Sequence, residues 1–161
     1  MQRIFFRSRV KQKLLFLVLT LFVLTLVASP AAYALYYSPS YYDKIAWTWE
    51  EVGPYTSTYN CLAYALGHTD RWIWPWGSSN PTDSEVDNYM AYLGYSNASW
   101  GTPYTPEIVS YGTSSEVVHF SKAFTVYSIA KWGSLELMKS YSWNPYNPQP
   151  DGYGFPVKLY F

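Results

Sequence analysis

The chain has 161 residues, and its 11 basic residues are matched by 11 acidic ones, so its length fits one domain and it has no formal net charge. Five basic residues lie before residue 14 and no acidic residue lies within the first 34, which leaves residues 35–161 with 6 basic and 11 acidic side chains and a formal net charge of −5. An acidic domain without clusters of Lys and Arg argues against nucleic-acid binding and against attraction to an anionic membrane surface, because both need positive charge.

The N-terminal segment has the order of a secretory signal peptide. A basic start, from Arg3 to Lys13, precedes an uncharged run over residues 14–27 that is apolar except for two threonines, and then the small-residue site Ala32-Tyr33-Ala34. The sequence therefore predicts a signal peptide over residues 1–34, cleavage after Ala34 and an exported, extracellular protein with no membrane segment left. The alternative is an uncleaved membrane anchor, although the run is shorter than the roughly 20 apolar residues that a spanning helix needs.

The next segment is predicted to form an arm ahead of the main domain. We expect residues 35–49 to be an N-terminal arm, extended over 35–42, and the domain to span residues 50–161. A short helix over 43–52 would end at Gly53-Pro54, because proline cannot extend a helix and biases the residue before it away from the helical conformation.

A second short helix is predicted to begin at Cys61, where small and apolar helix formers follow and Gly67 ends the run. Thr58 or Asn60 would be its N-cap. Residues 70–77 are too aromatic and too rich in Pro and Gly for regular structure, so we expect a loop whose indoles pack over the domain.

The clearest helix follows this loop. Asn80 is the expected N-cap, Pro81 the first helical residue, and Gly94 the end. The rest of the chain predicts strands over 107–112, 116–124, 125–132 and 155–161, a short helix over 134–140, and a proline-rich loop over 144–152. Helices followed by an antiparallel sheet indicate an α+β fold.

Cys61 is the only cysteine, so it cannot form an intramolecular disulfide, and a free thiol outside the cell needs an explanation. At a helix start, free N–H groups and the helix dipole favour the thiolate, which is the reactive form. The sequence therefore suggests a nucleophile. The alternative is a small buried hydrophobic residue in an Ala-rich helix.

A thiol nucleophile needs a base, and the chain has only two histidines. His68 lies seven residues after Cys61, about two helical turns and roughly 10 Å along the axis. His119 lies in a predicted strand and could face the helix that carries Cys61, although it could also be a structural histidine. A metal site from Cys61, His68, Asp70 and His119 lacks the usual paired spacing, so we expect no metal and no cofactor.

The motifs resemble those of a bacterial domain family of unassigned activity. Residues 51–54 read EVGP, residues 59–67 YNCLAYALG and residues 70–75 DRWIWP, and they are followed by VSYG at 109–112, VHF at 118–120, AKWG at 130–133 and YGFP at 153–156. The match covers about residues 50–161. The order of a cysteine helix, a histidine strand and a polar strand also resembles the papain-like superfamily in its NlpC/P60 and CHAP branches, which include secreted peptidoglycan hydrolases and amidases.

This resemblance implies roles for individual residues. Cys61 would be the nucleophile and His119 the base, and a residue on the strand after the histidine would orient it. Ser128 is the candidate there, because residues 127–131 contain no Asp, Asn, Glu or His, and Ala130 replaces the family's serine before the lysine.

The sequence therefore predicts a papain-like α+β domain that hydrolyses an amide bond in peptidoglycan or a peptide, acting as a monomer. The residues expected to contact substrate are Tyr59, Asn60, Trp72 and Trp74, with the tryptophan loop as one wall of the cleft. One rival is a non-catalytic binding or interaction module on the same fold, which the absent third residue and the tyrosine-rich surface favour. Another is a secreted antibacterial effector.

Overall fold

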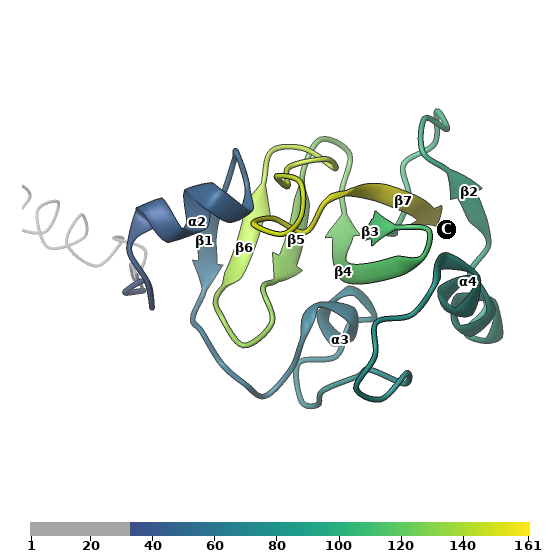
Figure 1. Ribbon diagram of the computed structural model, residues 1–161, viewed down its shortest axis with the longest axis horizontal. Helices are drawn as coiled ribbons and strands as arrows, with labels where there is room; N and C mark the ends of the chain where they lie inside the picture. Colours follow the sequence, from purple (N-terminus) through teal and green to yellow (C-terminus); the bar gives the residue numbers. More distant parts are fainter. Residues whose placement is uncertain (1–32) are drawn as a thin grey trace, which may run out of the picture. The chain divides into compact units, whose positions relative to one another are not determined.

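The computed structural model describes residues 33–161, and the predicted signal sequence up to residue 32 lies outside the described residues. Among the described residues, three short helices pack around a single sheet, as can be followed in Figure 1. The helices are α2 (Pro39–Ile45), α3 (Cys61–Ala65) and α4 (Asp83–Tyr92). The strands are β1 (Glu50–Gly53), β2 (Asn97–Ser99), β3 (Ile108–Thr113), β4 (Glu116–Ala123), β5 (Ser128–Lys131), β6 (Leu137–Ser140) and β7 (Phe155–Tyr160).

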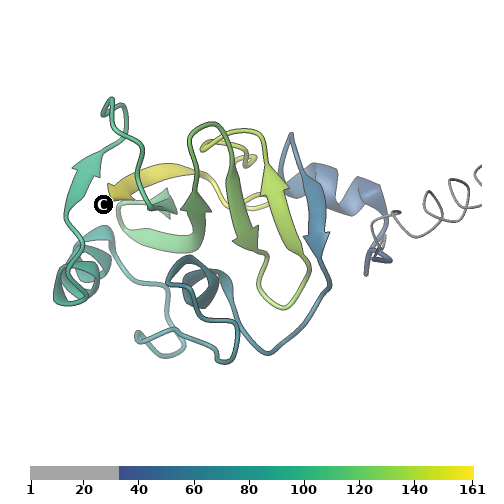
Figure 2. The same cartoon turned by 180° about the vertical axis from the view of Figure 1, so that it is seen from behind.

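All pairings in the seven-stranded sheet are antiparallel, and the strand order is β1-β6-β5-β4-β3-β7-β2. β4 pairs with β3 along most of its length but with β5 only through Lys122 and Ala123 at its end. The sheet is therefore open between the first part of β4 and the end of β5. Figures 1 and 2 show α3 beside this open end.

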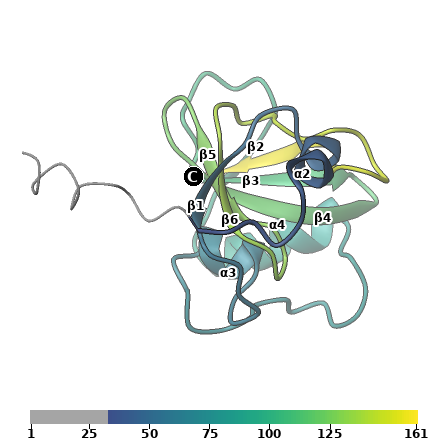
Figure 3. The ribbon, with the colours of Figure 1, turned by 90° about the vertical axis from the view of Figure 1, so that its left-hand side faces the viewer.

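Each face of the sheet carries its own apolar cluster. One cluster joins α2 to the sheet and includes Tyr42, Ile45, Tyr111 and Trp132. The other joins α3 and α4 to the opposite face. Alternation along a strand sends neighbours to opposite faces, so Leu159 belongs to the first cluster and Tyr160 to the second. In Figure 3, β4 runs between α2 and α3.

The α+β class with an antiparallel sheet is confirmed, as are the predicted strands that correspond to β3, β4, β5 and β7. The predicted cysteine helix is α3, and Asn60 is its N-cap. The predicted helix after the tryptophan loop is α4, but its cap is two residues later than expected. Thr82 accepts from the Glu85 N–H while the Glu85 side chain accepts from the Thr82 N–H, and this reciprocal capping box outcompetes Asn80.

The helix predicted over 134–140 is wrong, because residues Leu137–Ser140 form β6. Leu, Met and Lys are good helix formers, but the chain turns back after Lys131 and pairs residue by residue with β5. Met138 and Ser140 are then buried while Leu137 and Lys139 are not, which is the alternation of a strand.

The helix predicted over 43–52 is also wrong. α2 ends at Ile45, and residues Glu50–Gly53 pair with β6, where Glu50 lies opposite Lys139 and forms an ion pair of 3.4 Å with it. The segment expected to be an arm, 35–49, therefore contains a helix whose Tyr42 and Ile45 are part of the core. β2 was not predicted at all. None of the helices within residues 33–161 is long and apolar enough to cross a bilayer.

Candidate functional site

Asn60 connects the cysteine helix to the tryptophan loop. Its Oδ1 accepts hydrogen bonds from the N–H groups of Ala63 (3.1 Å) and Ile73 (3.2 Å), while its Nδ2 donates to the Ile73 carbonyl (2.8 Å). One buried amide thus caps α3 and holds the loop through both polar backbone groups of Ile73. This geometry gives Asn60 a structural role in setting the distance between Cys61 and the indoles.

The strand that carries His119 is irregular next to it. The pairing with β3 passes from Tyr111↔His119 to Gly112↔Val117, so Val118 is an extra residue without a partner in β3. A bulge of this kind bends a strand and changes the direction of its side chains. Val118 belongs to the part of β4 that does not pair with β5, and it lines the pocket described next.

A pocket of about 320 Å³ lies where β4 and β5 separate. It is lined by residues of α3, the tryptophan loop, β4, the β5–β6 turn and the loop before β7, namely Asn60, Cys61, Trp72, Trp74, Gly77, Val118, His119, Gly133 and Tyr153. Five of the seven residues singled out from the sequence are therefore in one place. The chain brings them together from positions up to 59 residues apart, from Asn60 to His119.

Cys61 lines this pocket and is 5% exposed. Burial raises its pKa to about 11, and this effect exceeds the lowering by the nearby backbone N–H groups of Phe120, Leu62 and Cys61 itself. The expected thiolate at the helix start is thus not the resting form. The prediction was wrong because it considered only the helix N-terminus, which lowers the pKa of the thiol. It left out the removal of solvent from around the sulfur, which raises the pKa by more.

The sulfur nevertheless lies near the histidine strand, since the backbone N–H of Phe120, the residue after His119, lowers the pKa of the thiol. The His119 side chain is buried, with its Nε2 3.0 Å from the Tyr146 hydroxyl and its ring stacked on Tyr153 at 3.8 Å and 7°. Burial lowers its pKa to about 3, so the imidazole is neutral at physiological pH. A tautomer protonated on Nε2 donates to Tyr146 and leaves Nδ1 as the basic nitrogen.

Tyr146 is held by the N-terminal part of the domain. The Trp47 N–H donates to the Pro145 carbonyl (3.0 Å) and the Asn147 N–H donates to the Ile45 carbonyl (2.9 Å), so Tyr146 forms a β-bridge with Ala46. The loop before β7 is thereby fastened to the end of α2.

Tyr153 lies between two glycines that the fold requires. A Cβ at Gly152 would come within 2.1 Å of the Asn147 carbonyl oxygen, and Gly154 has a φ of +81°. The backbone around Tyr153 therefore passes close to its neighbours, which fixes the position from which the tyrosine ring reaches His119.

Lys131 holds the β5–β6 turn, whose Gly133 lines the pocket. Its ammonium group donates to the carbonyls of Gly133 (2.8 Å) and Leu135, which stabilises the β5–β6 turn, and it lies 5.5 Å from the centre of the Tyr59 ring. Burial lowers its pKa to about 8. Tyr59 itself packs on Tyr64 and is not among the residues that line the pocket.

Ser128 does not have the hydrogen bond that the sequence predicted. Its hydroxyl donates to the Ser142 carbonyl (2.8 Å), whereas the partner of His119 is Tyr146. Neither Tyr146 nor Tyr153 was recognised as a site residue from the sequence. Tyr153 is part of the YGFP motif, which could have indicated it, but Tyr146 lies in a proline-rich loop with no such signal.

The tryptophan loop contributes side chains both to the apolar packing and to the pocket. Trp76 packs on Phe120 and Tyr89, and Trp74 packs on Trp76 while its indole N–H donates to the Ser79 carbonyl (3.2 Å). Trp72 is 51% exposed at the rim. Arg71 pairs with its neighbour Asp70 at 3.0 Å on the surface, so the loop is held by Asn60 and not by this ion pair.

His68 lies outside the pocket, with its Nδ1 3.7 Å from Asp70. Within residues 33–161, no group of three or more His, Cys, Asp or Glu side chains is arranged to hold a metal ion. The polar side chains that line the pocket include the thiol of Cys61, the imidazole of His119, the amide of Asn60 and the phenol of Tyr153.

Residues 40–161 match a family described as a domain of unknown function (DUF7689), and because the match covers most of the chain, the chain belongs to this family. The match begins within α2. No curated protein and no solved structure matches the chain.

Proposed function

We propose that this member of the DUF7689 family is an exported thiol-dependent hydrolase that cleaves an amide bond in a peptide or in peptidoglycan. The observation that supports the proposal most is that the only cysteine and one of the two histidines line the same pocket.

The resting pair would be a neutral thiol and a neutral imidazole, because burial raises the thiol pKa and lowers the imidazole pKa. His119 would then take the thiol proton while the sulfur attacks the carbonyl carbon. The C–N bond breaks as His119 returns the proton to the amine, which leaves a thioester on Cys61. Water, deprotonated by His119, attacks the thioester and releases the carboxylic acid and the thiol.

The oxyanion formed during attack needs hydrogen-bond donors that are already in place. The N–H groups of Cys61 and Leu62, which lie within reach of the sulfur, are the nearest candidates, since the Ala63 N–H is occupied by Asn60. Trp72 and Trp74 would cover the substrate from one side and keep water from the thiol.

We also propose that the fold is a distant variant of the papain-like type. The support is a cysteine at a helix start that packs against a histidine-bearing strand of an antiparallel sheet, with the two elements in the same chain order. The residue that holds the imidazole would differ, since it is Tyr146 from a loop.

One observation favours a second function, a binding module without catalysis. A base works best when its pKa is near the working pH, and the imidazole of His119 has a pKa of about 3. As a binding module, the protein would hold a peptide or glycan in this pocket, and Cys61 would form part of the apolar lining.

The experiment is hydrolysis of purified cell wall and of peptide libraries by four proteins: the wild type, Cys61→Ser, His119→Asn and His68→Asn. His68→Asn is the matched control, because it removes the histidine outside the pocket. We expect cleavage by the wild type and His68→Asn, and its loss in the other two with unchanged circular dichroism. Cleavage by Cys61→Ser would exclude the thiol mechanism, and binding without cleavage by the wild type would establish the module.

A further inference from the structure

A larger pocket, of about 590 Å³, adjoins the one that holds the thiol. It lies between α2, the start of β4, the β5–β6 turn and the loop before β7, and Val118 and Tyr153 line both pockets. Tyr153 therefore has the His119 ring against it and the larger pocket beside it. A ligand with its reacting bond at Cys61 could continue past Val118 and Tyr153 into the larger pocket.

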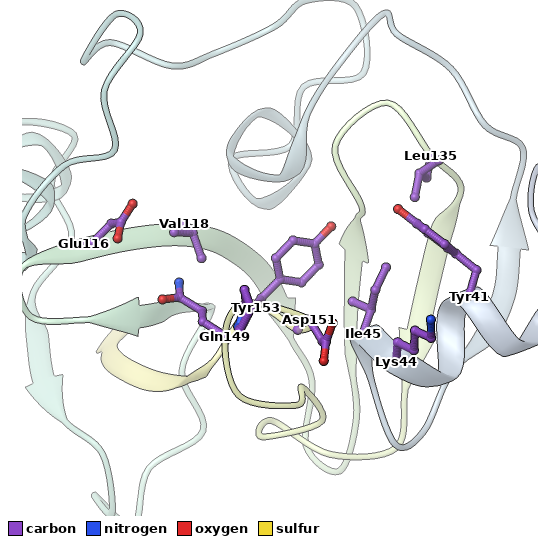
Figure 4. A pocket seen from close by; sticks show the side chains of 11 residues that line it. Tyr41, Lys44, Ile45, Glu116, Val118, Leu135, Gln149, Asp151 and Tyr153 are labelled. Atoms are coloured by element: carbon purple, nitrogen blue, oxygen red, sulfur yellow. The ribbon is translucent and has the colours of Figure 1, made fainter.

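Glu116 and Lys44 lie at the two ends of the larger pocket, and apolar side chains together with Asp151 and Gln149 lie between them (Figure 4). Figure 4 shows Glu116 far from Lys44, with Val118, Tyr153 and Ile45 between them. Asp151 is the second carboxylate in the lining. The polar and apolar parts thus alternate over the length of the cavity.

The three charged side chains of this pocket are Lys44, Glu116 and Asp151, and they are free to contact a ligand. Among residues 33–161, none of the three makes an ion pair, although Glu116 accepts a hydrogen bond of 2.9 Å from the Asn80 amide. The pocket carries two carboxylates against one ammonium group, and residues 35–161 have a net charge of −5. The local and the overall charge both favour a cationic group in the ligand.

We propose that this pocket binds the part of a peptide substrate that flanks the cleaved amide, and that it selects a residue with a basic side chain or a free amine through Glu116 and Asp151. The proposal rests on the proposed function for the position of the cleaved bond. The volume lies within the range of known small-molecule sites and suits two or three residues. The apolar stretch at Val118 and Ile45 would contact the aliphatic part of such side chains.

The test is calorimetric binding of three capped tripeptides to the Cys61→Ser protein: acetyl-Ala-Lys-Ala-amide, the Gln form and the Glu form. Exposed ion pairs change affinity about two- to fivefold each, so we expect the Lys peptide to bind roughly tenfold more tightly than the Glu peptide. Glu116→Gln and Asp151→Asn should each reduce this preference severalfold. Lys44→Gln is the matched control, because it removes the opposite charge and should preserve or increase the preference.

The preference should also weaken as salt is raised from 0.05 to 0.5 M, since exposed charges are screened. Equal binding of the three peptides, no binding at millimolar concentration, or binding of chitotriose in their place would overturn the proposal. Preferential binding of the Lys peptide with no cleavage by the wild type would support the pocket and reject the hydrolase. Cleavage that is indifferent to the Glu116 and Asp151 substitutions would reject the pocket and support the hydrolase.

Discussion

At the scale of single residues, burial determines the protonation states of Cys61 and His119. Cys61 and His119 are both almost fully removed from solvent, and in each case the uncharged form is favoured. The pair differs in this respect from a preformed thiolate–imidazolium pair, in which each charge would stabilise the other. Its reactivity would depend on proton transfer during attack.

The first prediction concerns the alkylation of Cys61. With a pKa of about 11, the folded thiol contains about a hundredfold less thiolate at pH 8 than an ordinary thiol near 9. Iodoacetamide should therefore modify the native protein at pH 8 about a hundredfold more slowly than the urea-unfolded protein, as followed by mass spectrometry. Because the chain has one cysteine, no other thiol contributes. Rapid alkylation of the native protein below pH 7 would instead demonstrate an ion pair.

The second prediction concerns Tyr146. Tyr146→Phe keeps the buried ring but removes the hydroxyl that partners His119 Nε2, which should cost about 1–3 kcal/mol in the free energy of unfolding. The freed imidazole should also change its tautomer balance, which is measurable as a shift of its ¹⁵N resonances. Tyr92→Phe, at an exposed tyrosine, is the control and should change neither quantity. Unchanged His119 resonances in Tyr146→Phe would show that the hydroxyl does not orient the ring.

At the scale of elements, the short helix α3 is stable only through its neighbours. It has five residues, which is too few for a helix to persist alone, and its N-terminus is held by Asn60. The same amide fixes the tryptophan loop, so the two walls of the thiol pocket share one anchor.

Replacing this anchor gives the third prediction. Asn60→Ala removes the cap and leaves both polar groups of Ile73 without their partner, so urea unfolding should show a loss of about 2–4 kcal/mol. Thr58→Ala is the control, because Thr58 is exposed and hydrogen-bonds only to Thr56 among the residues described. A loss below 0.5 kcal/mol, a threshold typical of surface substitutions, would mean that the loop is held by its indoles alone.

At the scale of the whole molecule, the buried imidazole makes stability depend on pH. The unfolded chain takes up the His119 proton near pH 6.5, whereas the folded chain does so only near pH 3, so the unfolded state binds more protons between these values. Stability should therefore fall as the pH drops through this window, by up to about 1.4 kcal/mol per pH unit.

The fourth prediction follows from this linkage. His119→Asn should lose less stability between pH 6.5 and 4 than the wild type does, as measured by urea denaturation at several pH values. The carboxylates whose pKa is lowered by hydrogen bonds, such as Glu85 and Glu50, destabilise both proteins in acid and cancel in the comparison. Parallel curves for wild type and His119→Asn would show that His119 is not buried in its neutral form.

The sequence was sufficient for the features that depend on local pattern and chain order. It predicted α3, most of the central strands, and the convergence of Cys61, His119, Trp72 and Trp74 on one pocket. It could not show that Tyr146 would partner His119, because that contact depends on how a proline-rich loop packs against α2. β6 was missed for a similar reason, since pairing with β5 outweighed the helix propensity of its residues.

The attachment of the loop before β7 to the end of α2 makes the environment of His119 depend on the N-terminal segment of the domain. Removal of residues 1–49 would keep Cys61, His119, Tyr146 and Tyr153 in the chain but would delete the Ile45 and Trp47 backbone groups that hold Pro145 and Asn147. We predict that such a truncated protein loses the native His119 resonances. A synthetic peptide of residues 33–49, added in excess, should restore them, because α2 joins the core through Tyr42 and Ile45. Proteolysis between α2 and β1, followed by loss of the released fragment, would then displace Tyr146 from His119 without removing any residue that lines the thiol pocket.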